Sequence, residues 1–307
     1  MAQSIGAAPP LRRPRGAARK PVMEDMHSNT RAALWMGGWL ALMMVTAVAG
    51  REAARTLSVF QVMELRSLIG FVMLMPLVLR SGGFTAMRTG RPVAHLARNA
   101  VHYVGQLSFL YAVTVISLAE LVSIEFTTPF WTAIFAVLFL GERMTRATAA
   151  AIALGIVGVA VIVRPGTGAI EAGHLVMLGG AVAFGISLVM VKSLTRTEST
   201  VRIIFWMLVV QAAIGLAPAL YLWRTPPAEA WPWIVLISFS GTFSHFCMTR
   251  ALVYADAMVV APMDYLRVPL TALVGWLLYS EKIDVYIAVG AALILAGNLV
   301  NLKRRPR

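Results

Sequence analysis

Charged side chains within two long apolar segments carry the clearest chemical signal of this sequence. Asp264 and Arg267 are three residues apart, and Thr271 follows one helical turn later. In a helix this spacing places all three side chains on one face. A charge at the centre of a membrane-spanning helix costs about 2.5–3.5 kcal/mol, so both charges should face a polar cavity or each other. The pattern predicts either a site for a solute with two opposite charges or a structural ion pair.

An earlier apolar segment carries a second polar stripe. Glu125, Thr128, Pro129 and Thr132 have the spacing i, i+3, i+4 and i+7, which is one helix face. Pro129 leaves a backbone carbonyl free one turn earlier, which is a common feature of transporter sites. We expect Glu125 to bind a cationic amino group or a proton, and the alternative is a residue at the membrane interface.

Two histidines inside apolar segments are candidates for proton transfer. His102 shares a helix face with Gln106, and His245 follows Ser244 in a later segment. Because histidine titrates near neutral pH, His102 or His245 would be the base of a proton relay or of an intramembrane enzyme. The alternative is hydrogen bonding between helices, worth about 0.6 kcal/mol in a membrane.

Other signs of enzyme or metal chemistry are missing from the sequence. It contains no H-E-x-x-H, G-x-S-x-G or Walker motif, and Cys247 is its one cysteine. We therefore expect no enzymatic activity, no metal and no cofactor.

The remaining charges near the apolar segments receive a structural interpretation. Glu64 and Arg66 are two residues apart and do not share a helix face, and Arg66 should extend toward the membrane surface. Glu142 and Glu281 follow apolar segments, so we expect them to end helices or to pair with a neighbouring loop. His95 falls in a predicted loop, for which we predict no function.

The composition is that of a membrane protein with several spans. Of the 307 residues, 59% are hydrophobic and 13% are charged, against about 45–50% and about 25% in soluble proteins. A net charge of +13 would suggest nucleic acid in a soluble protein, but here it lies in the short segments between apolar stretches. A soluble enzyme, a disordered chain and a nucleic-acid module are excluded as first interpretations.

Ten apolar segments approach the roughly 20 residues that a spanning helix needs. They cover residues 34–50, 57–79, 99–116, 120–140, 147–163, 174–191, 203–222, 231–249, 257–280 and 283–301. Residues 1–32 are basic and lack an apolar period, which predicts a disordered cytoplasmic tail with Met23 or Met26 as alternative starts. The first apolar segment has an alternative as a signal peptide, because residues 47–49 resemble a cleavage site.

The distribution of Lys and Arg predicts the orientation. With a cytoplasmic N-terminus, twenty of the 27 fall in cytoplasmic segments and five in periplasmic ones. The remaining two, Arg66 and Arg267, lie within spans. This excess of positive charge on one side predicts a multi-pass protein of the bacterial inner membrane with both termini in the cytoplasm.

The two halves of the sequence match at an offset of 139 residues. The fourth and fifth apolar segments then align without gaps on the ninth and tenth. The matched pairs include Glu125 with Asp264, Thr132 with Thr271, Glu142 with Glu281 and Gly158 with Gly297. Five spans per copy is an odd number, so the second copy is inverted, as in secondary transporters that bind substrate near the membrane midplane. We predict a first five-helix repeat at 33–165, an inverted second repeat at 173–302 and a basic cytoplasmic tail at 303–307.

These segments also resemble the EamA family of the drug/metabolite transporter superfamily. The resemblance covers about residues 33–302, and its most specific parts are 125–133 (EFTTPFWTA), 140–143 (LGER), 155–166 (GIVGVAVIVRPG) and 261–281 (APMDYLRVPLTALVGWLLYSE). It implies an all-α membrane protein of ten helices in two inverted repeats that transports small metabolites such as amino acids, riboflavin or S-adenosylmethionine. Ser280 stands where the family usually has glycine.

The sequence is thus interpreted as a secondary transporter, with export of amino acids or related zwitterions as the expected activity. Uptake of a cofactor-like solute of the S-adenosylmethionine or riboflavin type is the first alternative, and an intramembrane enzyme is the second. Expected partners are a small-molecule substrate, the lipid bilayer and protons as candidate coupling ions, but no nucleic acid; monomer and homodimer both remain open. The predicted substrate-binding residues are Glu125, Thr128, Thr132, Asp264, Arg267, Thr271, Gln106, His102 and His245.

Overall fold

The described part of the chain is helical throughout. The computed structural model describes residues 28–115, 124–163, 172–267 and 285–302, together with the single positions 269, 270, 273 and 277. Within them no strand occurs, which confirms the predicted helical class. The helices are α1 (Asn29–Ala53), α2 (Val59–Arg80), α3 (Gly83–Ala86), α4 (Pro92–Val115), α6 (Thr128–Leu140), α7 (Arg146–Val163), α8 (Ala172–Thr195), α9 (Thr200–Tyr221), η1 (Ala228–Ala230), α10 (Trp231–Tyr254), α11 (Ala257–Val260), η2 (Ala261–Leu266) and α13 (Val285–Leu302).

Serine side chains fix the beginning of three long helices. Ser28, Ser58 and Ser199 each precede a helix and accept a hydrogen bond from the backbone N–H three residues later. Such caps satisfy an N–H group that has no partner within the helix. The cap at Ser28 starts α1 five residues before the predicted apolar segment at 34–50, because a helix extends beyond its apolar part.

Several helices have the length and surface of membrane spans. Four of them, beginning at Asn29, Val59, Ala172 and Thr200, are long and apolar enough to cross a bilayer. Large apolar side chains are exposed on their outer faces and on other helices; Leu34 is 73% exposed and Val72 68% exposed. Soluble proteins rarely expose apolar surface on this scale, so these faces are suited to lipid.

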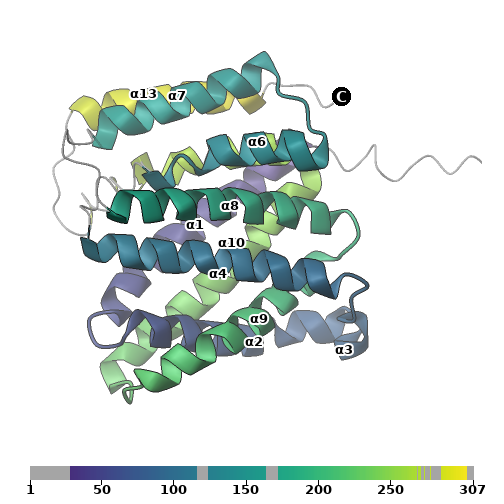
Figure 1. The fold of residues 1–307 in the computed structure, drawn as a ribbon, viewed down its shortest axis with the longest axis vertical. Helices are drawn as coiled ribbons and strands as arrows, with labels where there is room; N and C mark the ends of the chain where they lie inside the picture. Colours follow the sequence, from purple (N-terminus) through teal and green to yellow (C-terminus); the bar gives the residue numbers. More distant parts are fainter. Residues whose placement is uncertain are drawn as a thin grey trace, which may run out of the picture.

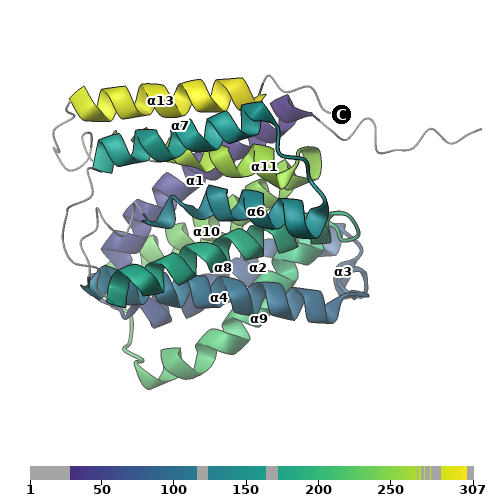
Figure 2. The same ribbon diagram turned by 45° about the horizontal axis from the view of Figure 1, so that its top comes forward.

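The helices form layers in which each half packs against the other. α7 and α13 lie side by side at one edge, α6, α8 and α4 follow, and α2 packs with α9 at the opposite edge (Figure 1). α1 packs along α10 behind these layers, and the turned view keeps α13 beside α7 (Figure 2). The largest helix contacts therefore join an element before residue 165 to one after residue 171.

Glycines permit the close approach of two of these helix pairs. A Cβ atom at Gly158 of α7 would lie 2.7 Å from the Gly290 carbonyl oxygen of α13. A Cβ atom at Gly180 of α8 would lie 2.8 Å from the Ser108 Cβ of α4. Small residues at helix interfaces are common in membranes, where close van der Waals packing drives association.

The predicted ninth span begins with an irregular segment. Residues 257–280 were expected to form one helix, but α11 covers four residues and continues as the 3-10 helix η2. Pro262 lies in the first turn of η2, where its missing N–H costs no hydrogen bond. Asp264 lies within this tighter turn, and short 3-10 stretches of this kind often mark functional positions.

Candidate functional site

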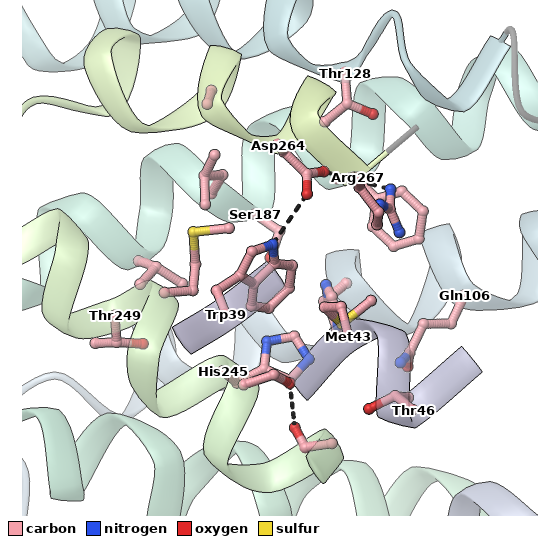
Figure 3. A pocket seen from close by; sticks show the side chains of 18 of the residues that line it. Trp39, Met43, Thr46, Gln106, Thr128, Ser187, His245, Thr249, Asp264 and Arg267 are labelled. Atoms are coloured by element: carbon pink, nitrogen blue, oxygen red, sulfur yellow. Dashed lines mark hydrogen bonds and ion pairs between the residues drawn. The ribbon is translucent and has the colours of Figure 1, made fainter. Parts of the chain in front are cut away.

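A polar cavity of about 220 Å³ lies among the helices of both halves. Its wall is built from α1, α2, α4, α8 and α10 together with the segment that leads into α6 and with η2. Figure 3 shows the labelled side chains Trp39, Gln106, His245, Asp264 and Arg267 around this space. Side chains that are far apart in the sequence therefore lie around one cavity.

Seven of the nine predicted residues line this cavity. They are His102, Gln106, Glu125, Thr128, His245, Asp264 and Arg267. Thr132 is fully buried and does not line the cavity; its backbone nitrogen instead lies 3.0 Å from where a Cβ on Gly185 of α8 would be. The stripe was predicted for a continuous helix, whereas α6 begins only at Thr128. Thr271 and the signature residue Glu281 lie outside the described residues.

An acidic cluster forms one end of the cavity. Arg267 Nη2 donates to Glu125 Oε1 at 2.8 Å and lies 3.3 Å from Asp264 Oδ2. Trp39 Nε1 donates to Asp264 Oδ1 at 2.9 Å (Figure 3). The cluster joins α1, the segment before α6 and the segment around η2, and two carboxylates around one guanidinium give it one net negative charge. Asp264 and Arg267 therefore both contact each other and face the cavity.

Aromatic and imidazole rings lead away from the acidic cluster. The Trp39 and His245 ring centroids are 5.5 Å apart, and those of His245 and His102 are 5.4 Å apart. His102 also contacts the Phe184 ring at 5.5 Å. The two histidines, which are far apart in sequence, thus meet in the cavity wall and bring α4 and α10 together there.

Two arginines at the cavity were not among the predicted site residues. Arg66 Nη2 donates to Gln211 Oε1 at 3.1 Å, and Arg98 Nη1 donates to Asn99 Oδ1 at 2.6 Å. Both line the cavity and interact electrostatically with both histidines. Within the part of the chain that the structure describes, neither guanidinium has a carboxylate partner. The cavity therefore has a basic region in addition to its acidic end.

The sequence held a signal for Arg66 but not for Arg98. Arg66 lies within a predicted span, so the cost of a buried charge pointed to it as it did to Arg267. The structure corrects the prediction that it extends to the membrane surface, because its guanidinium contacts Gln211 of α9 instead. Arg98 was assigned to a loop, but α4 begins at Pro92 and carries Arg98 in its second turn.

A second charged cluster lies at helix ends, away from the cavity. Gly141, with a φ of 67°, ends α6 in a left-handed conformation that favours glycine, and Glu142 follows it. The Glu142 carboxylate accepts the backbone N–H groups of Ala257 at 3.0 Å and Met258 at 3.1 Å. Burial raises the pKa of Glu142, against these hydrogen bonds, which act to lower it. Glu142 thus caps α11 as well as following α6.

The end of α10 is bound by a lysine of α8. Lys192 Nζ donates to the carbonyl oxygens of Leu252 at 2.8 Å and Ala255 at 2.7 Å. A positive charge at a helix C-terminus is favoured by the helix dipole. Asp256, which lies 4.0 Å from Lys192, joins this contact to α11.

A buried carboxylate also connects the beginning of α9 to α4. Glu198 accepts a hydrogen bond from Thr89 Oγ1 at 2.5 Å and pairs with Arg202. Burial acts to raise the pKa of Glu198, but the bonds from Thr89 and Arg202 and the Arg202 charge outweigh it and lower the pKa. His95 lies 3.9 Å from Glu198 and is buried in α4, so its predicted position in a loop was wrong.

Comparison with known proteins gives the same picture over most of the chain. The EamA-like transporter family model matches residues 31–164 and again residues 171–302. A solved crystal structure superposes with a TM-score of 0.76 at 18% identity, covering 89% of this chain and 96% of that chain. At this identity the structural match shows the fold alone.

Characterised relatives carry the names of three different transporters. The S-adenosylmethionine uptake transporter of Rickettsia prowazekii is 26% identical over 85% of this chain and 90% of its own length. The riboflavin transporter of Rhizobium johnstonii is 32% identical over 78% of this chain and 80% of its own length. The pseudopaline exporter CntI of Pseudomonas aeruginosa is 28% identical over 80% of this chain and 86% of its own length. The chain therefore belongs to the EamA-like transporter family of the drug/metabolite transporters and is a membrane transporter of small molecules.

Proposed function

We propose that this protein is a secondary carrier for small zwitterionic metabolites of the amino-acid type. The observation that carries the proposal is the separation of charge in one cavity. Glu125 and Asp264 supply the negative end, and Arg66 and Arg98 supply guanidinium groups that have no carboxylate partner among the described residues. An α-amino acid carries an ammonium and a carboxylate on one carbon skeleton, which matches these two ends.

Each end has a defined role in this proposal. The substrate ammonium takes the place of Arg267 beside Glu125 or Asp264, because those carboxylates already accept from a cation. The substrate carboxylate binds Arg66 or Arg98, whose planar guanidinium offers two parallel donors to a carboxylate. This arrangement differs from the sequence-based expectation, in which Asp264 and Arg267 themselves formed the site for a solute with two opposite charges.

Cavity size favours a compact solute. The volume of about 220 Å³ lies below the range of about 300–1,000 Å³ that is typical of sites for drug-sized ligands. A solute as large as riboflavin or S-adenosylmethionine would need a wider state of the carrier. S-adenosylmethionine is the second candidate, because relatives are named for its uptake and it combines an amino-acid group with a flat base that Trp39 or Phe184 would stack against.

The proposed architecture is ten spans in two inverted repeats, residues 33–165 and 173–302, with both termini in the cytoplasm. The packing supports this division, since the pair α1 with α10 has its counterpart in α8 with α4 when the halves are exchanged. The pairs α2 with α9 and α7 with α13 map onto themselves in the same exchange. The two family matches fall on the same halves. Amino-acid export across the bacterial inner membrane is the direction that we propose.

Binding to the purified protein tests the substrate class. Titration calorimetry would compare L-methionine, S-adenosylmethionine and riboflavin, and metabolite analysis of medium and cytosol would compare deletion and overexpressing cells. We expect the two solutes with an amino-acid group to bind and riboflavin not to bind. Riboflavin binding without binding of the other two would overturn the proposed substrate class. Accumulation of amino acids in the cytosol of overexpressing cells would overturn export.

Reporter fusions test the topology independently of the substrate. A fusion after Arg307 and one within residues 81–91 should be active only as cytoplasmic reporters. A fusion within residues 225–230 should be active only as a periplasmic reporter. A periplasmic C-terminus would overturn the proposed topology of ten spans with both termini in the cytoplasm.

A further inference from the structure

Glu64 is a buried acid outside the cavity that the proposed function does not use. It lies on α2, is 3% exposed, and neither of its carboxyl oxygens has a hydrogen-bond partner within the described part of the chain. An isolated ionised carboxylate in an apolar environment is so costly that such groups take up a proton instead. Its geometry therefore indicates a carboxyl group that carries a proton at neutral pH.

The groups around Glu64 are also incompletely bonded. A Cβ atom on Gly215 of α9 would lie 2.8 Å from Glu64 Oε2 and 3.5 Å from the Tyr103 hydroxyl, so both groups meet at this glycine. The Tyr103 hydroxyl is buried and has no hydrogen-bond partner among the described residues. Gln211 lies one helical turn before Gly215 on the same face, and its Nε2 is likewise without a partner there. Several buried donors and acceptors are thus available around one carboxyl group.

The charged neighbours of this group are few. Tyr103 of α4 is the titratable group that interacts electrostatically with Glu64, and α9 faces it with the uncharged Gln211 and Gly215. α10, which also packs on α2, contacts Arg66 with Gly241 and Gly70 with Thr242. Arg66, on α2 itself, reaches Gln211 and the cavity rather than Glu64.

Polar side chains flank Glu64 toward the protein surface and toward the cavity. Gln61, one turn earlier on α2, exchanges two hydrogen bonds with the backbone of the exposed residue Arg224, one of them at 3.1 Å. On the other side, Gln211 accepts from Arg66, which lines the cavity. Glu64 therefore lies between a polar contact with the surface and a polar contact with the cavity.

We propose that Glu64, Tyr103 and Gln211 form the coupling-proton site of this carrier. The coupling role of this site rests on the proposed function. The binding of a proton at Glu64 does not depend on the proposed function. When a substrate carboxylate binds Arg66, it competes with Gln211 for the guanidinium. The released Gln211 amide then donates to the Glu64 carboxylate, and the Glu64 proton leaves to water. Substrate binding and proton binding at Glu64 thus oppose each other, which corresponds to exchange of substrate for a proton.

Infrared spectroscopy of the reconstituted protein tests the proton site without any substrate. The difference spectrum between wild type and Glu64→Gln should contain the carbonyl stretch of a protonated carboxylic acid at neutral pH. The band should shift in D₂O, disappear at alkaline pH and persist in Glu64→Asp. Glu229→Gln, at an exposed carboxyl group, should not remove it. Absence of the band, or a band that does not exchange in D₂O, would overturn the proton site.

Transport in proteoliposomes tests the coupling. The probes are radiolabelled L-methionine and S-adenosylmethionine, with and without an imposed pH gradient. Glu64→Gln should lose gradient-driven accumulation and retain exchange of labelled for unlabelled probe, whereas Glu64→Asp should retain both. Unchanged accumulation by Glu64→Gln would overturn the coupling role. If wild type moves neither probe, the proposed substrate class fails, and the infrared result still decides whether Glu64 binds an exchangeable proton.

Discussion

Arg267 and Lys192 are both largely buried cations, but their partners differ. Lys192 donates to the backbone carbonyl oxygens of Leu252 and Ala255 at the end of α10. Arg267 contacts the side-chain carboxylates of Glu125 and Asp264 in the wall of a cavity. Backbone carbonyls cannot change partner without unwinding the helix, whereas carboxylates beside a cavity can accept from a solute.

We propose that this difference separates charges that serve transport from charges that hold helices together. Burial alone does not distinguish them, because both clusters are largely removed from solvent. What distinguishes them is whether a cavity lies beside the charge and whether its partner is a side chain or the backbone. Changes in the cavity cluster should therefore affect transport, and changes at the helix ends should affect stability.

The largest effect is expected from changes in the cavity cluster. Asp264→Asn and Arg267→Lys should each lower transport by about 100-fold or more, because truncating one partner of a buried charge pair costs about 2–5 kcal/mol. Lysine keeps the charge of Arg267 but loses the planar fork that contacts two carboxylates. Transport of radiolabelled L-methionine into vesicles measures the effect, with gel filtration to confirm that each variant is folded.

A reversal of the pair separates a substrate site from a structural ion pair. In Asp264→Arg with Arg267→Asp the attraction between the two positions survives, so a purely structural pair should tolerate the exchange. A substrate site should lose transport even in folded protein, because the substrate ammonium would then meet a guanidinium at position 264 where the proposed site has a carboxylate. Normal flux from the reversed protein, with single variants that merely unfold, would leave the pair as packing.

Arg66 and Arg98 should control recognition of the substrate carboxylate. Arg66→Gln and Arg98→Gln should weaken L-methionine binding by about 10- to 100-fold, because each removes a charged hydrogen bond to the carboxylate. Binding of the corresponding amine without the carboxyl group should change little. Arg55→Gln, at an exposed arginine, serves as the control. Equal losses for the amino acid and the amine would contradict a carboxylate-binding role.

The sequence predicted the helical class and seven of the residues that line the cavity, because buried charge is costly and periodicity reveals helix faces. Glu125 and Asp264 are among these seven, although 139 residues separate them. Thr132 follows Thr128 by one turn in α6, but at Thr132 the helix packs closely against Gly185 of α8 instead of facing the cavity. The periodicity argument fails where a helix is interrupted, which is also where Asp264 lies in η2.

The roles of Arg66, Glu64 and Glu142 depended on tertiary contacts that no local pattern contains. Arg66 and Glu64 are two residues apart, yet Arg66 reaches Gln211 and the cavity while Glu64 lies against Gly215. Glu142 was expected to end its own helix or to pair with a loop, and its carboxylate instead caps α11, more than one hundred residues later. Such contacts follow from how the two halves pack.

Loss of the Glu142 carboxylate should affect stability and leave transport by the folded protein nearly unchanged. Glu142→Ala leaves two N–H groups at the start of α11 without an acceptor, which should cost about 2 kcal/mol of unfolding free energy. Thermal unfolding in detergent measures the loss, and Glu229→Ala, at an exposed carboxylate, should show none. A transport defect in Glu142→Ala at wild-type stability would place Glu142 among the functional charges instead.

The smallest expected effect concerns Glu198, whose contribution should depend on pH. Its folded-state pKa is lowered, because the bonds from Thr89 and Arg202 outweigh burial, so the folded protein binds a proton there less tightly than the unfolded chain. The stabilisation is therefore fully present above the unfolded value of about 4.3 and is lost as pH falls through the lower folded value. Glu198→Gln should lower the unfolding free energy by about 1 kcal/mol at neutral pH.

That deficit should shrink as the pH falls below the unfolded value, because wild-type Glu198 then also becomes neutral. Paired unfolding measurements on wild type and Glu198→Gln across this range test the sign, with His95 kept intact in both proteins because it lies 3.9 Å from the carboxylate. A deficit that stays constant with pH would mean that hydrogen bonds, and not the charge of Glu198, hold α9 against α4. If Glu198→Gln lowered transport and left the unfolding free energy unchanged, Glu198 would belong with the charges that serve transport. The distinction between cavity charges and helix-end charges would then fail at this residue.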